Sequence, residues 1–300
     1  MKSVHKSVLL QEVVDGLYIG LQDGETKWYL DGTLGGAGHA LAMAKSFKGN
    51  INIIGLDADS KAIERAGQTL QGHCRRLILE ATSYRHLDEV LDKNEVPSID
   101  LMLLDLGLSS DELENSGKGF SFQKDEPLLM TFGDKGYYFN AYDVINSWKE
   151  EDLSNVIFAY GEERYARRIA RAILRYREKK KVETSGELAE LVKMSVPPPY
   201  RHGKTHPATK TFQALRIVVN DELACLREGL HKGFERLKSG GRIAVISFHS
   251  LEDRIVKNFF QEKKKEGLGE IPSKHIVPSA QEIAENPRSR SAKLRIIHKL

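Results

Sequence analysis

The fold is decided at Lys27-Trp-Tyr-Leu-Asp-Gly-Thr-Leu-Gly-Gly-Ala-Gly-His39, where an apolar run ends in an acid and glycines follow at once. Glycine lets a backbone turn sharply and approach a ligand closely. The residues after the turn predict a helix, whose N-terminus offers unpaired N–H groups to an anionic group. The stretch therefore predicts a strand, a ligand-binding turn and a helix in succession.

The same alternation of strand and helix recurs on both sides of a central interruption. Apolar runs predict strands over residues 51–57, 76–80, 99–105 and 242–247, and an edge strand over 294–298. The run over 99–105 is apolar almost throughout, as in a parallel strand covered by helices on both faces. We therefore expect an α/β fold with a doubly wound, Rossmann-like sheet.

The central interruption has a different character. Residues 107–136 are rich in Gly, Ser, Asp and Phe and predict a long loop, whereas residues 140–194 are helical in pattern without strand signals. Prolines at 197–199 end that run, and a helix over 208–237 resumes the alternation. We expect a core of residues 1–110 and 205–300, interrupted by a mostly helical inserted domain of residues 111–204.

Composition sets broad limits on function. The 300 residues include 45 Lys and Arg against 42 Asp and Glu, and the net charge of +3 permits a nucleic-acid partner without demanding one. Cys74 and Cys225 form no CxxC pair, so we expect no metal site. The sequence has neither a signal-peptide pattern nor a run of about 18 apolar residues, which predicts a cytoplasmic protein without membrane contact.

An adenosine-containing cofactor is indicated by Asp57, which ends the second predicted strand and can accept hydrogen bonds from ribose hydroxyls. The glycine spacing is not the GxGxxG of dinucleotide folds. Asp31, at the turn, would repel a pyrophosphate but suit a methionine amino group or a sulfonium. These charges favour S-adenosylmethionine over NAD. The alternative is a glycine turn that only packs a helix on the sheet, with Asp57 at the surface.

Groups suited to chemistry follow two other predicted strands. Asp105, in Asp105-Leu-Gly-Leu-Ser-Ser110, can accept a hydrogen bond from a substrate amine, or it can simply cap a turn. His249, just past the fifth strand, can accept a released proton near neutral pH or serve as a structural hydrogen-bonding group. Its neighbour Phe248 either stacks on a target base or packs in the core.

Four arginines align on one face of a predicted helix. Arg164, Arg168, Arg171 and Arg175 lie opposite an apolar face. A basic face is usually only solvated. Because no acid is interleaved here, the stripe predicts contact with RNA phosphates.

These motifs, and others along almost the whole chain, resemble the bacterial small-subunit ribosomal RNA cytosine-N4 methyltransferases, the RsmH or MraW family. Further strings that carry the resemblance are His5-Lys-Ser-Val-Leu-Leu-Gln-Glu-Val13, Gly119-Phe-Ser-Phe122, Tyr160-Gly-Glu-Glu-Arg164, His206-Pro-Ala-Thr-Lys-Thr-Phe-Gln-Ala-Leu-Arg216, Ile246-Ser-Phe-His-Ser-Leu-Glu-Asp-Arg254 and Asn286-Pro-Arg-Ser-Arg290. The resemblance implies a class I methyltransferase sheet and an S-adenosylmethionine-dependent enzyme. It implies methylation of a cytosine N4 amine in 16S ribosomal RNA, with ribosomal RNA or the small subunit as partner. A homodimer is compatible with it.

The resemblance also implies which residues contact the cofactor. They are Ala37, Gly38, His39, Asp57, Tyr84, Asp105 and Glu112. Tyr84 stands where the family often has Phe, and Glu112 where it usually has Gln. Leu129 and Thr131 replace an Asp and an Arg of the family pattern, which puts substrate positioning in doubt. Two alternatives therefore stay open: a catalytically weak or redirected member acting as an RNA-binding or assembly factor, and a DNA or small-molecule amine methyltransferase.

Overall fold

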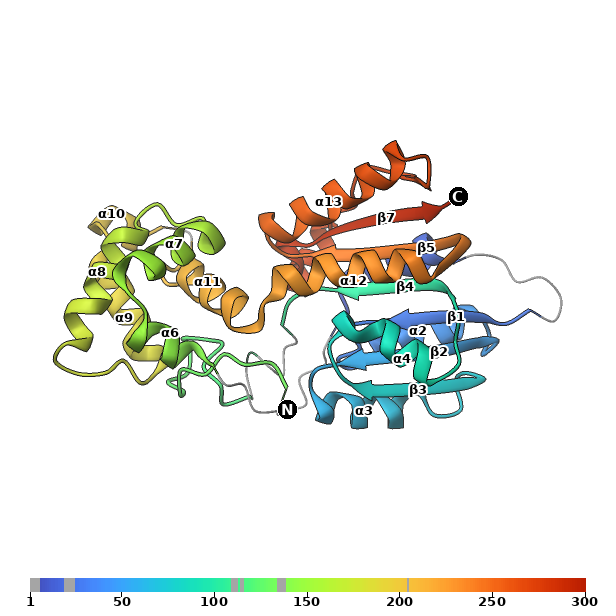
Figure 1. Ribbon diagram of the computed structural model, residues 1–300, viewed down its shortest axis with the longest axis horizontal. Helices are drawn as coiled ribbons and strands as arrows, with labels where there is room; N and C mark the ends of the chain where they lie inside the picture. The colour runs from blue at the N-terminus through green and yellow to red at the C-terminus, as the bar shows by residue number, and fades with distance from the viewer. Residues whose placement is uncertain (1–5, 19–24, 109–112, 114–115, 134–138, 204) are drawn as a thin grey trace. The chain divides into compact units, whose positions relative to one another are not determined.

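A computed structural model describes residues 6–18, 25–108, 113, 116–133, 139–203 and 205–300. The chain divides into two compact units (Figure 1). The core unit comprises Met1–Gly107 and Leu223–Leu300, and the helical unit comprises Leu108–Glu222. Among the helices of the described ranges, none is both long and apolar enough to cross a membrane.

Within the described residues, the core unit forms a seven-stranded sheet in the order β3-β2-β1-β4-β5-β7-β6. The strands are β1 (Lys27–Asp31), β2 (Ile51–Asp57), β3 (Arg76–Ala81), β4 (Ile99–Asp105), β5 (Leu237–Ser247), β6 (Gly269–Glu270) and β7 (Lys293–Lys299). The first five are parallel, and β7 is antiparallel to both of its neighbours. The expected doubly wound, Rossmann-like sheet is thus confirmed. The predicted edge strand is not at the edge, because the two-residue β6 pairs with its outer side.

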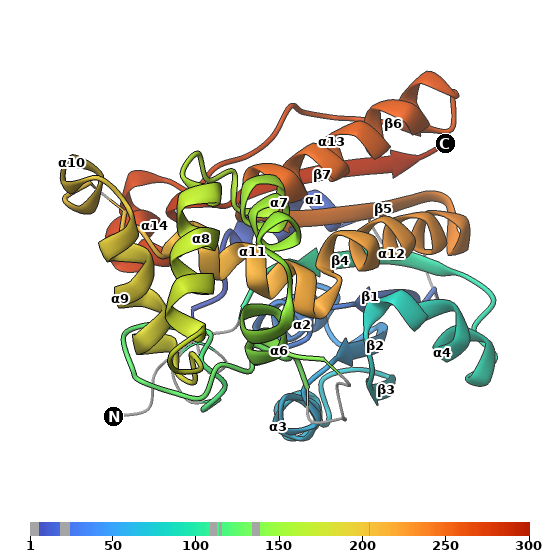
Figure 2. The ribbon, with the colours of Figure 1, turned by 60° about the vertical axis from the view of Figure 1, so that its left-hand side comes forward.

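Helices cover both faces of this sheet (Figures 1 and 2). Along β4, Leu101 and Leu103 enter one apolar layer while Met102 and Leu104 enter the other, as the alternation of a strand requires. One layer packs against α1 (Leu10–Leu17), α2 (Gly38–Ser46) and α3 (Ser60–Leu70), the other against α4 (Leu87–Lys93), α12 (Glu222–Arg236) and α13 (Ser250–Lys265). The short elements η1 (Tyr84–His86), α14 (Ala280–Glu285) and η2 (Pro287–Ser291) complete the unit.

The strand order reverses between β1 and β4, which are neighbours in the sheet although not in the chain. Gly32 N–H donates to Leu103 O at 3.0 Å, so the turn after β1 leaves the sheet directly beside the end of β4. In open α/β sheets, ligands bind outside the carboxyl ends of the strands at such a switch point. The fold therefore points to the ends of β1, β2 and β4 as the place to look for a site.

The helical unit has an apolar core of its own. Its helices among the described residues are α6 (Ala141–Ser147), α7 (Glu150–Gly161), α8 (Ala166–Arg177), α9 (Ser185–Ser195), α10 (Pro198–Arg201) and α11 (Thr209–Asn220). The irregular segment before them joins the same core through Phe120, Leu128 and Met130. It is held at its end by Asn220, whose Oδ1 accepts Phe132 N–H and whose Nδ2 donates to Met130 O, both at 2.8 Å.

The second boundary between the units lies at Glu222, later than the residue 204 expected from the sequence. The helix predicted over 208–237 is two helices, because Asp221 adopts a left-handed conformation with φ of 51° and ends α11. Phe212 and Leu215 of α11 are buried in the core of the helical unit. A Cβ on Gly161 of α7 would lie 2.5 Å from Lys210 O, so α11 packs tightly within that unit.

Candidate active site

The glycine turn after β1 is braced by Asp57. Asp57 Oδ2 accepts Gly35 N–H at 2.8 Å, and Oδ1 accepts Asp59 N–H at 2.9 Å. Burial raises the pKa of Asp57, and the two backbone hydrogen bonds oppose that shift. Since a carboxylate has about four acceptor positions, two remain for hydroxyl donors. The sequence predicts an acceptor for ribose hydroxyls at Asp57, but it does not predict that the same carboxylate holds the turn.

Asp31 lies beneath this turn at the end of β1 and is buried. It accepts hydrogen bonds from the Tyr29 hydroxyl at 3.0 Å and from Thr33 N–H at 3.2 Å. Burial nevertheless raises the pKa of Asp31 to about 6. A cationic group brought to the turn would favour the ionised carboxylate, which is the charge preference expected from the sequence.

His39, in the first turn of α2, is buried with its Nε2 3.4 Å from Asp105 Oδ2. Burial lowers the pKa of His39, but the nearby Asp105, with the charges of Asp31 and Glu282, outweighs it and leaves the pKa raised. The imidazole is thus held by the charges of protein carboxylates, and neither ring nitrogen has a hydrogen-bond partner among the described residues. His39 also presents a backbone N–H at the N-terminus of α2.

Asp105 is tied to the same turn by its own backbone, because its N–H donates to Thr33 Oγ1 at 2.6 Å. Its Oδ1 is buried and has no hydrogen-bond partner among the described residues. A buried acceptor without a partner costs about 1–3 kcal/mol, so such an atom calls for an explanation. A donor on a ligand at the switch point would satisfy it.

Tyr84, at the start of η1, stands between the glycine turn and α12. A Cβ on Gly32 would lie 2.9 Å from Tyr84 Cβ, and one on Gly229 would lie 2.5 Å from Tyr84 Cδ2. Gly229 is therefore a positioning residue for the aromatic ring that sequence reasoning missed. A glycine inside a helix costs roughly 1 kcal/mol of stability, so its presence in a helical pattern was the signal that another side chain approaches the helix there.

A short N-terminal segment lies over the start of α2. A Cβ on Gly38 would stand 2.1 Å from Ser7 Oγ, so the Ser7 side chain packs directly on the backbone of this glycine. The segment is anchored by α14, because Glu282 Oε1 accepts Leu9 N–H at 2.8 Å. Two segments far apart in the sequence therefore close over the turn.

His249 and Phe248 follow β5. His249 is the N-cap of α13, with Nδ1 accepting Glu252 N–H at 3.4 Å, while Glu252 Oε2 accepts Phe248 N–H at 2.8 Å. His249 and Glu252 together form a capping box at the start of α13. The His249 imidazole is turned toward its own helix, with Nε2 3.1 Å from Glu252 Oε1. Phe248 packs against the core and the backbone at Gly107.

Comparison with known proteins identifies the family. Residues 2–300 match the model of the MraW methylase family. The chain belongs to this family. Ribosomal RNA small subunit methyltransferase H of Sulfurihydrogenibium sp. (strain YO3AOP1) is 46% identical over 293 residues, covering 97% of this chain and 98% of that protein. The protein of the same name from Paenibacillus sp. (strain JDR-2) is 42% identical over 318 residues, covering 99% of each.

Among solved structures, an rRNA methylase from Streptococcus thermophilus aligns over 97% of this chain and 93% of its own, with 10% identity and a TM-score of 0.45. That likeness is weak, and the assignment rests on the sequence relatives. They confirm the family resemblance that the motifs predicted.

As expected for a member of the MraW methylase family, the cofactor is S-adenosylmethionine. The residues at the switch point fit it. Asp57 retains acceptor positions for two hydroxyls, Asp31 favours a nearby cation, and α2 offers N–H groups to a carboxylate. Of the residues implied to contact the cofactor, Ala37, Gly38, His39, Asp57, Tyr84 and Asp105 lie at the ends of β1 to β4 or in the turn and helix starts that follow them. Glu112 lies outside the described residues.

The family-pattern departures at Leu129 and Thr131 lie in the helical unit. Leu129 N–H donates to Lys118 O at 3.2 Å, and Leu129 O accepts Ala141 N–H at 2.9 Å. Thr131 lies between Met130 and Phe132, whose backbones are bonded to Asn220. The segment is therefore held through its backbone groups, partly by the side chain of Asn220, and not through the side chains of Leu129 and Thr131.

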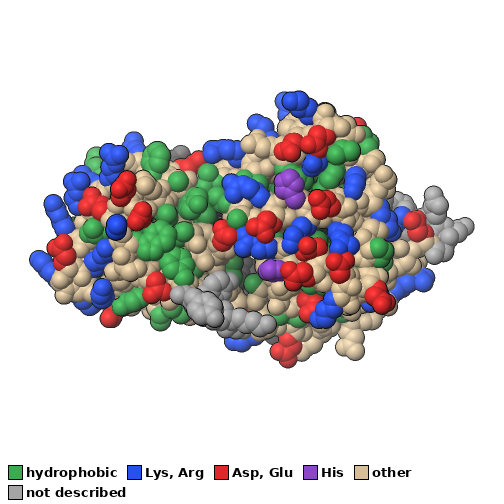
Figure 3. Space-filling model, viewed as in Figure 1, with side chains coloured by type: hydrophobic (Ala, Val, Ile, Leu, Met, Phe, Trp, Pro, Cys, Tyr) green, Lys and Arg blue, Asp and Glu red, His purple; other side chains and the backbone are tan. Residues whose placement is uncertain are grey.

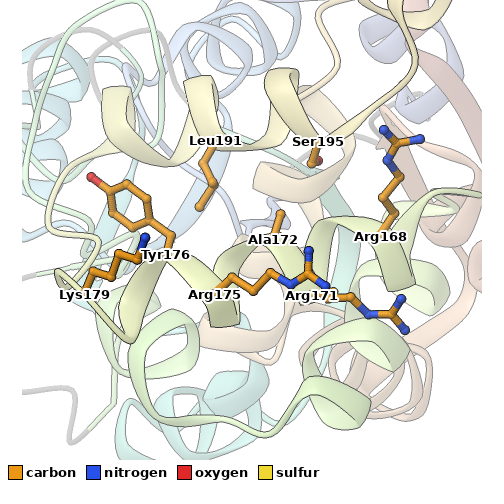
Figure 4. Close-up of a pocket in the computed structure, with 8 residues that line it drawn as sticks. All are labelled: Arg168, Arg171, Ala172, Arg175, Tyr176, Lys179, Leu191 and Ser195. Atoms are coloured by element: carbon orange, nitrogen blue, oxygen red, sulfur yellow. The ribbon is translucent and has the colours of Figure 1, made fainter.

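Three of the four predicted arginines meet in one place. Arg168, Arg171 and Arg175 line a hollow of about 610 Å³ between α8 and α9 (Figure 4). Arg164 stands apart, with its guanidinium over the rings of Tyr165 and Tyr200 at 4.8 and 5.1 Å. In Figure 3, Lys and Arg side chains follow the margin of the helical unit where α8 lies.

The sequence suggested that no acid lies beside the arginine stripe, but the structure places one there. Arg171 Nε lies 3.3 Å from Glu150 Oε1, which comes from α7 and could not be foreseen from helical spacing within α8. Both side chains are substantially exposed, so this pair is weak and open to competition from another anion.

Proposed function

We propose that this MraW-family methylase transfers a methyl group to the N4 amine of a cytosine in the RNA of the small ribosomal subunit. Support for the RNA comes from the curated relatives, which are named ribosomal RNA small subunit methyltransferase H. Support for an amine acceptor comes chiefly from one atom, Oδ1 of Asp105 at the switch point, which is buried and has no partner among the residues that the structure describes.

The chemistry needs such an acceptor because cytosine N4 is a poor nucleophile whose lone pair is conjugated with the ring. A hydrogen bond from the amine to Asp105 Oδ1 would orient the nitrogen and draw its lone pair out of conjugation. As the N–C bond forms and the sulfonium S–C bond breaks, the nitrogen becomes positive and that hydrogen bond strengthens. An interaction that is stronger in the transition state than in the ground state accelerates the reaction.

The protein residues around the turn have separate roles in this proposal. When bound, S-adenosylmethionine supplies the sulfonium methyl. Ala37, Gly38 and His39 present backbone groups to it, Asp57 accepts the ribose hydroxyls, and Tyr84 offers an aromatic face to the adenine. Glu112 is assigned a cofactor contact by family resemblance alone.

The proton lost from N4 needs an acceptor. Asp105 can take it first, since its Oδ1 holds the amine hydrogen. His249 remains a predicted second acceptor, but its Nδ1 already caps α13, so we favour its structural role.

The helical unit is proposed to bind the RNA. Arg168, Arg171 and Arg175 would contact phosphates, and their clustering around one hollow supports this. Arg164 belongs to the predicted stripe, but its stacking on two tyrosines favours a packing role.

The deciding experiment supplies labelled S-adenosylmethionine with purified undermethylated small subunits, free ribosomal RNA and duplex DNA in parallel, and maps the modified atom. Label on a cytosine N4 of the subunit or its RNA is the expected result, with Asp105→Asn as the matched slow control. Preference for duplex DNA would favour a DNA amine methyltransferase. Binding of cofactor and subunit without transfer would favour an assembly factor.

A further inference from the structure

The hollow between α8 and α9 has two chemically distinct parts. Its basic part consists of side chains from α8 and the residues just after it: Arg168, Arg171, Arg175 and Lys179. Its other part is mostly apolar, formed by Ala172, Tyr176 and Leu191, with the buried Ser195 beside them. Figure 4 shows the basic side chains spread along one helix, with Tyr176 extending toward α9 and Leu191 pointing back toward α8.

The basic part carries uncompensated charge. Arg168, Arg175 and Lys179 form no ion pair within the described part of the chain, and all three are exposed. Arg171 alone is paired, with Glu150. Guanidinium groups are weakly hydrated and match phosphate oxygens with parallel N–H donors. This side of the hollow is therefore suited to a phosphodiester backbone.

The apolar part is suited to a flat ring. Tyr176 and Leu191 are both half-buried, so part of each side chain faces the hollow. A volume of about 610 Å³ falls within the size range of small-ligand sites. A surface that binds only the backbone of duplex RNA needs no such apolar part, because the bases stay stacked inside the duplex.

We propose that this hollow binds an unpaired nucleotide of RNA, with its base stacked on Tyr176 beside Leu191 and its phosphates on Arg168, Arg171 and Arg175. The inference rests on the proposed function only in taking RNA as the substrate. It adds that the helical unit recognises a single-stranded stretch. Aromatic side chains beside basic ones are the usual means of holding single strands.

The test measures binding of the full chain to a fluorescein-labelled oligoribonucleotide of about ten unstructured nucleotides, and to the same strand annealed to its complement. The single strand should bind more tightly. Tyr176→Leu should weaken its binding roughly fivefold or more, the scale of one lost stacking contact, whereas Tyr176→Phe, which keeps the ring, should not. Thermal unfolding of both variants separates lost stacking from lost folding.

The charge side is tested by salt titration. Arg168→Gln with Arg175→Gln should flatten the dependence of log affinity on log salt by about 0.7 per lost contact. Arg167→Gln is the matched control, since Arg167 is an exposed arginine of α8 that does not line the hollow. An equal effect of the control would overturn the assignment to this hollow.

Equal affinity for duplex and single strand, or an unchanged affinity in folded Tyr176→Leu, would overturn the stacking proposal. Failure of the wild-type protein to bind either the single strand or the duplex would overturn it as well. These measurements omit the methyl donor, so they stand apart from the methyl-transfer assay. RNA binding that depends on Tyr176, without any methylation, would count against the proposed function alone. A folded Tyr176→Leu variant that methylates and keeps wild-type RNA affinity would count against the nucleotide-binding role of the hollow alone.

Discussion

The imidazole of His39 lies with Nε2 3.4 Å from Asp105 Oδ2, which joins the first turn of α2 to the end of β4. The contact gives the two oxygens of the Asp105 carboxylate different surroundings. One oxygen faces the protein, and the other, Oδ1, is buried without a partner among the described residues. A side chain held from one side in this way is oriented before any ligand arrives, which lowers the cost of reaching a reactive geometry.

Asp105→Asn should slow single-turnover methylation by about 10²-fold, because asparagine keeps the shape but loses the charge that stabilises a developing positive nitrogen. Affinity for S-adenosylmethionine, measured by calorimetry, should fall far less. A mutant that methylates at nearly the wild-type rate with both ligands saturating, or whose defect disappears at high cofactor concentration, would contradict a chemical role.

His39→Gln should destabilise the protein more at low pH than at high pH. The pKa of His39 is raised in the fold by Asp105, Asp31 and Glu282 against the effect of burial. Its stabilising contribution is therefore complete below the ordinary histidine pKa near 6.5 and is lost as the pH rises through the higher folded value. Denaturant unfolding of wild type and mutant across this range is the measurement. A difference in stability that does not vary with pH would show that His39 is not protonated in the fold.

Asp31 should make the stability of the fold depend on pH in a more acidic range than His39 does. Because the folded pKa is raised to about 6 from an ordinary 3.8, the fold holds this proton more tightly than the unfolded chain does. Stability should fall by on the order of 3 kcal/mol as the pH rises from about 4 to about 6. Asp31→Asn should remove that part of the fall, and the exposed Asp15→Asn should not. If the two variants give the same pH profile, burial does not perturb Asp31.

Asp57→Ala should weaken S-adenosylmethionine binding by about 1.5–3 kcal/mol through loss of charged hydrogen bonds. It should also lower stability, since Gly35 and Asp59 lose their acceptor. Asp57→Asn keeps one acceptor oxygen and separates the two effects, because the turn is then still partly braced. Calorimetric affinity that stays constant in both variants would remove Asp57 from the cofactor site.

His249→Ala should cost about 1 kcal/mol of stability, the usual effect of losing an N-cap. His249→Asn, which restores a good capping side chain, should recover most of that stability and methylate within a few-fold of wild type. A hundredfold loss of rate in a fully stable His249→Asn protein would instead establish His249 as the proton acceptor.

The strand ends could be predicted from sequence because burial on both faces leaves a continuous apolar run that stops at a polar residue. Asp31, Asp57 and Asp105 were found in this way, and all three end parallel strands of one sheet. Parallel strands bring their carboxyl ends to one edge, so the sequence alone was enough to place these acids together.

Contacts across long stretches of sequence could not be predicted. The approach of Tyr84 to Gly229 depends on how α12 packs on the sheet, which no local pattern encodes. The break at Asp221 was missed because a non-glycine residue in the left-handed region gives little signal. Arg164 fits the predicted helical stripe by spacing, but it lies in the turn before α8, and its guanidinium stacks on Tyr200 of α10.

The segment over Gly38 has a consequence for the order of events during synthesis. Leu9 is made early, but its partner Glu282 follows 273 residues later. The helical unit is one continuous stretch of chain and can fold while it emerges from the ribosome, whereas β4 must wait for β5. The cover of the glycine turn is completed late, because only η2 and β7 follow α14 in the chain. A nascent chain should therefore acquire tight cofactor binding only after translation has passed α14, so that a chain stalled before that point stays inactive.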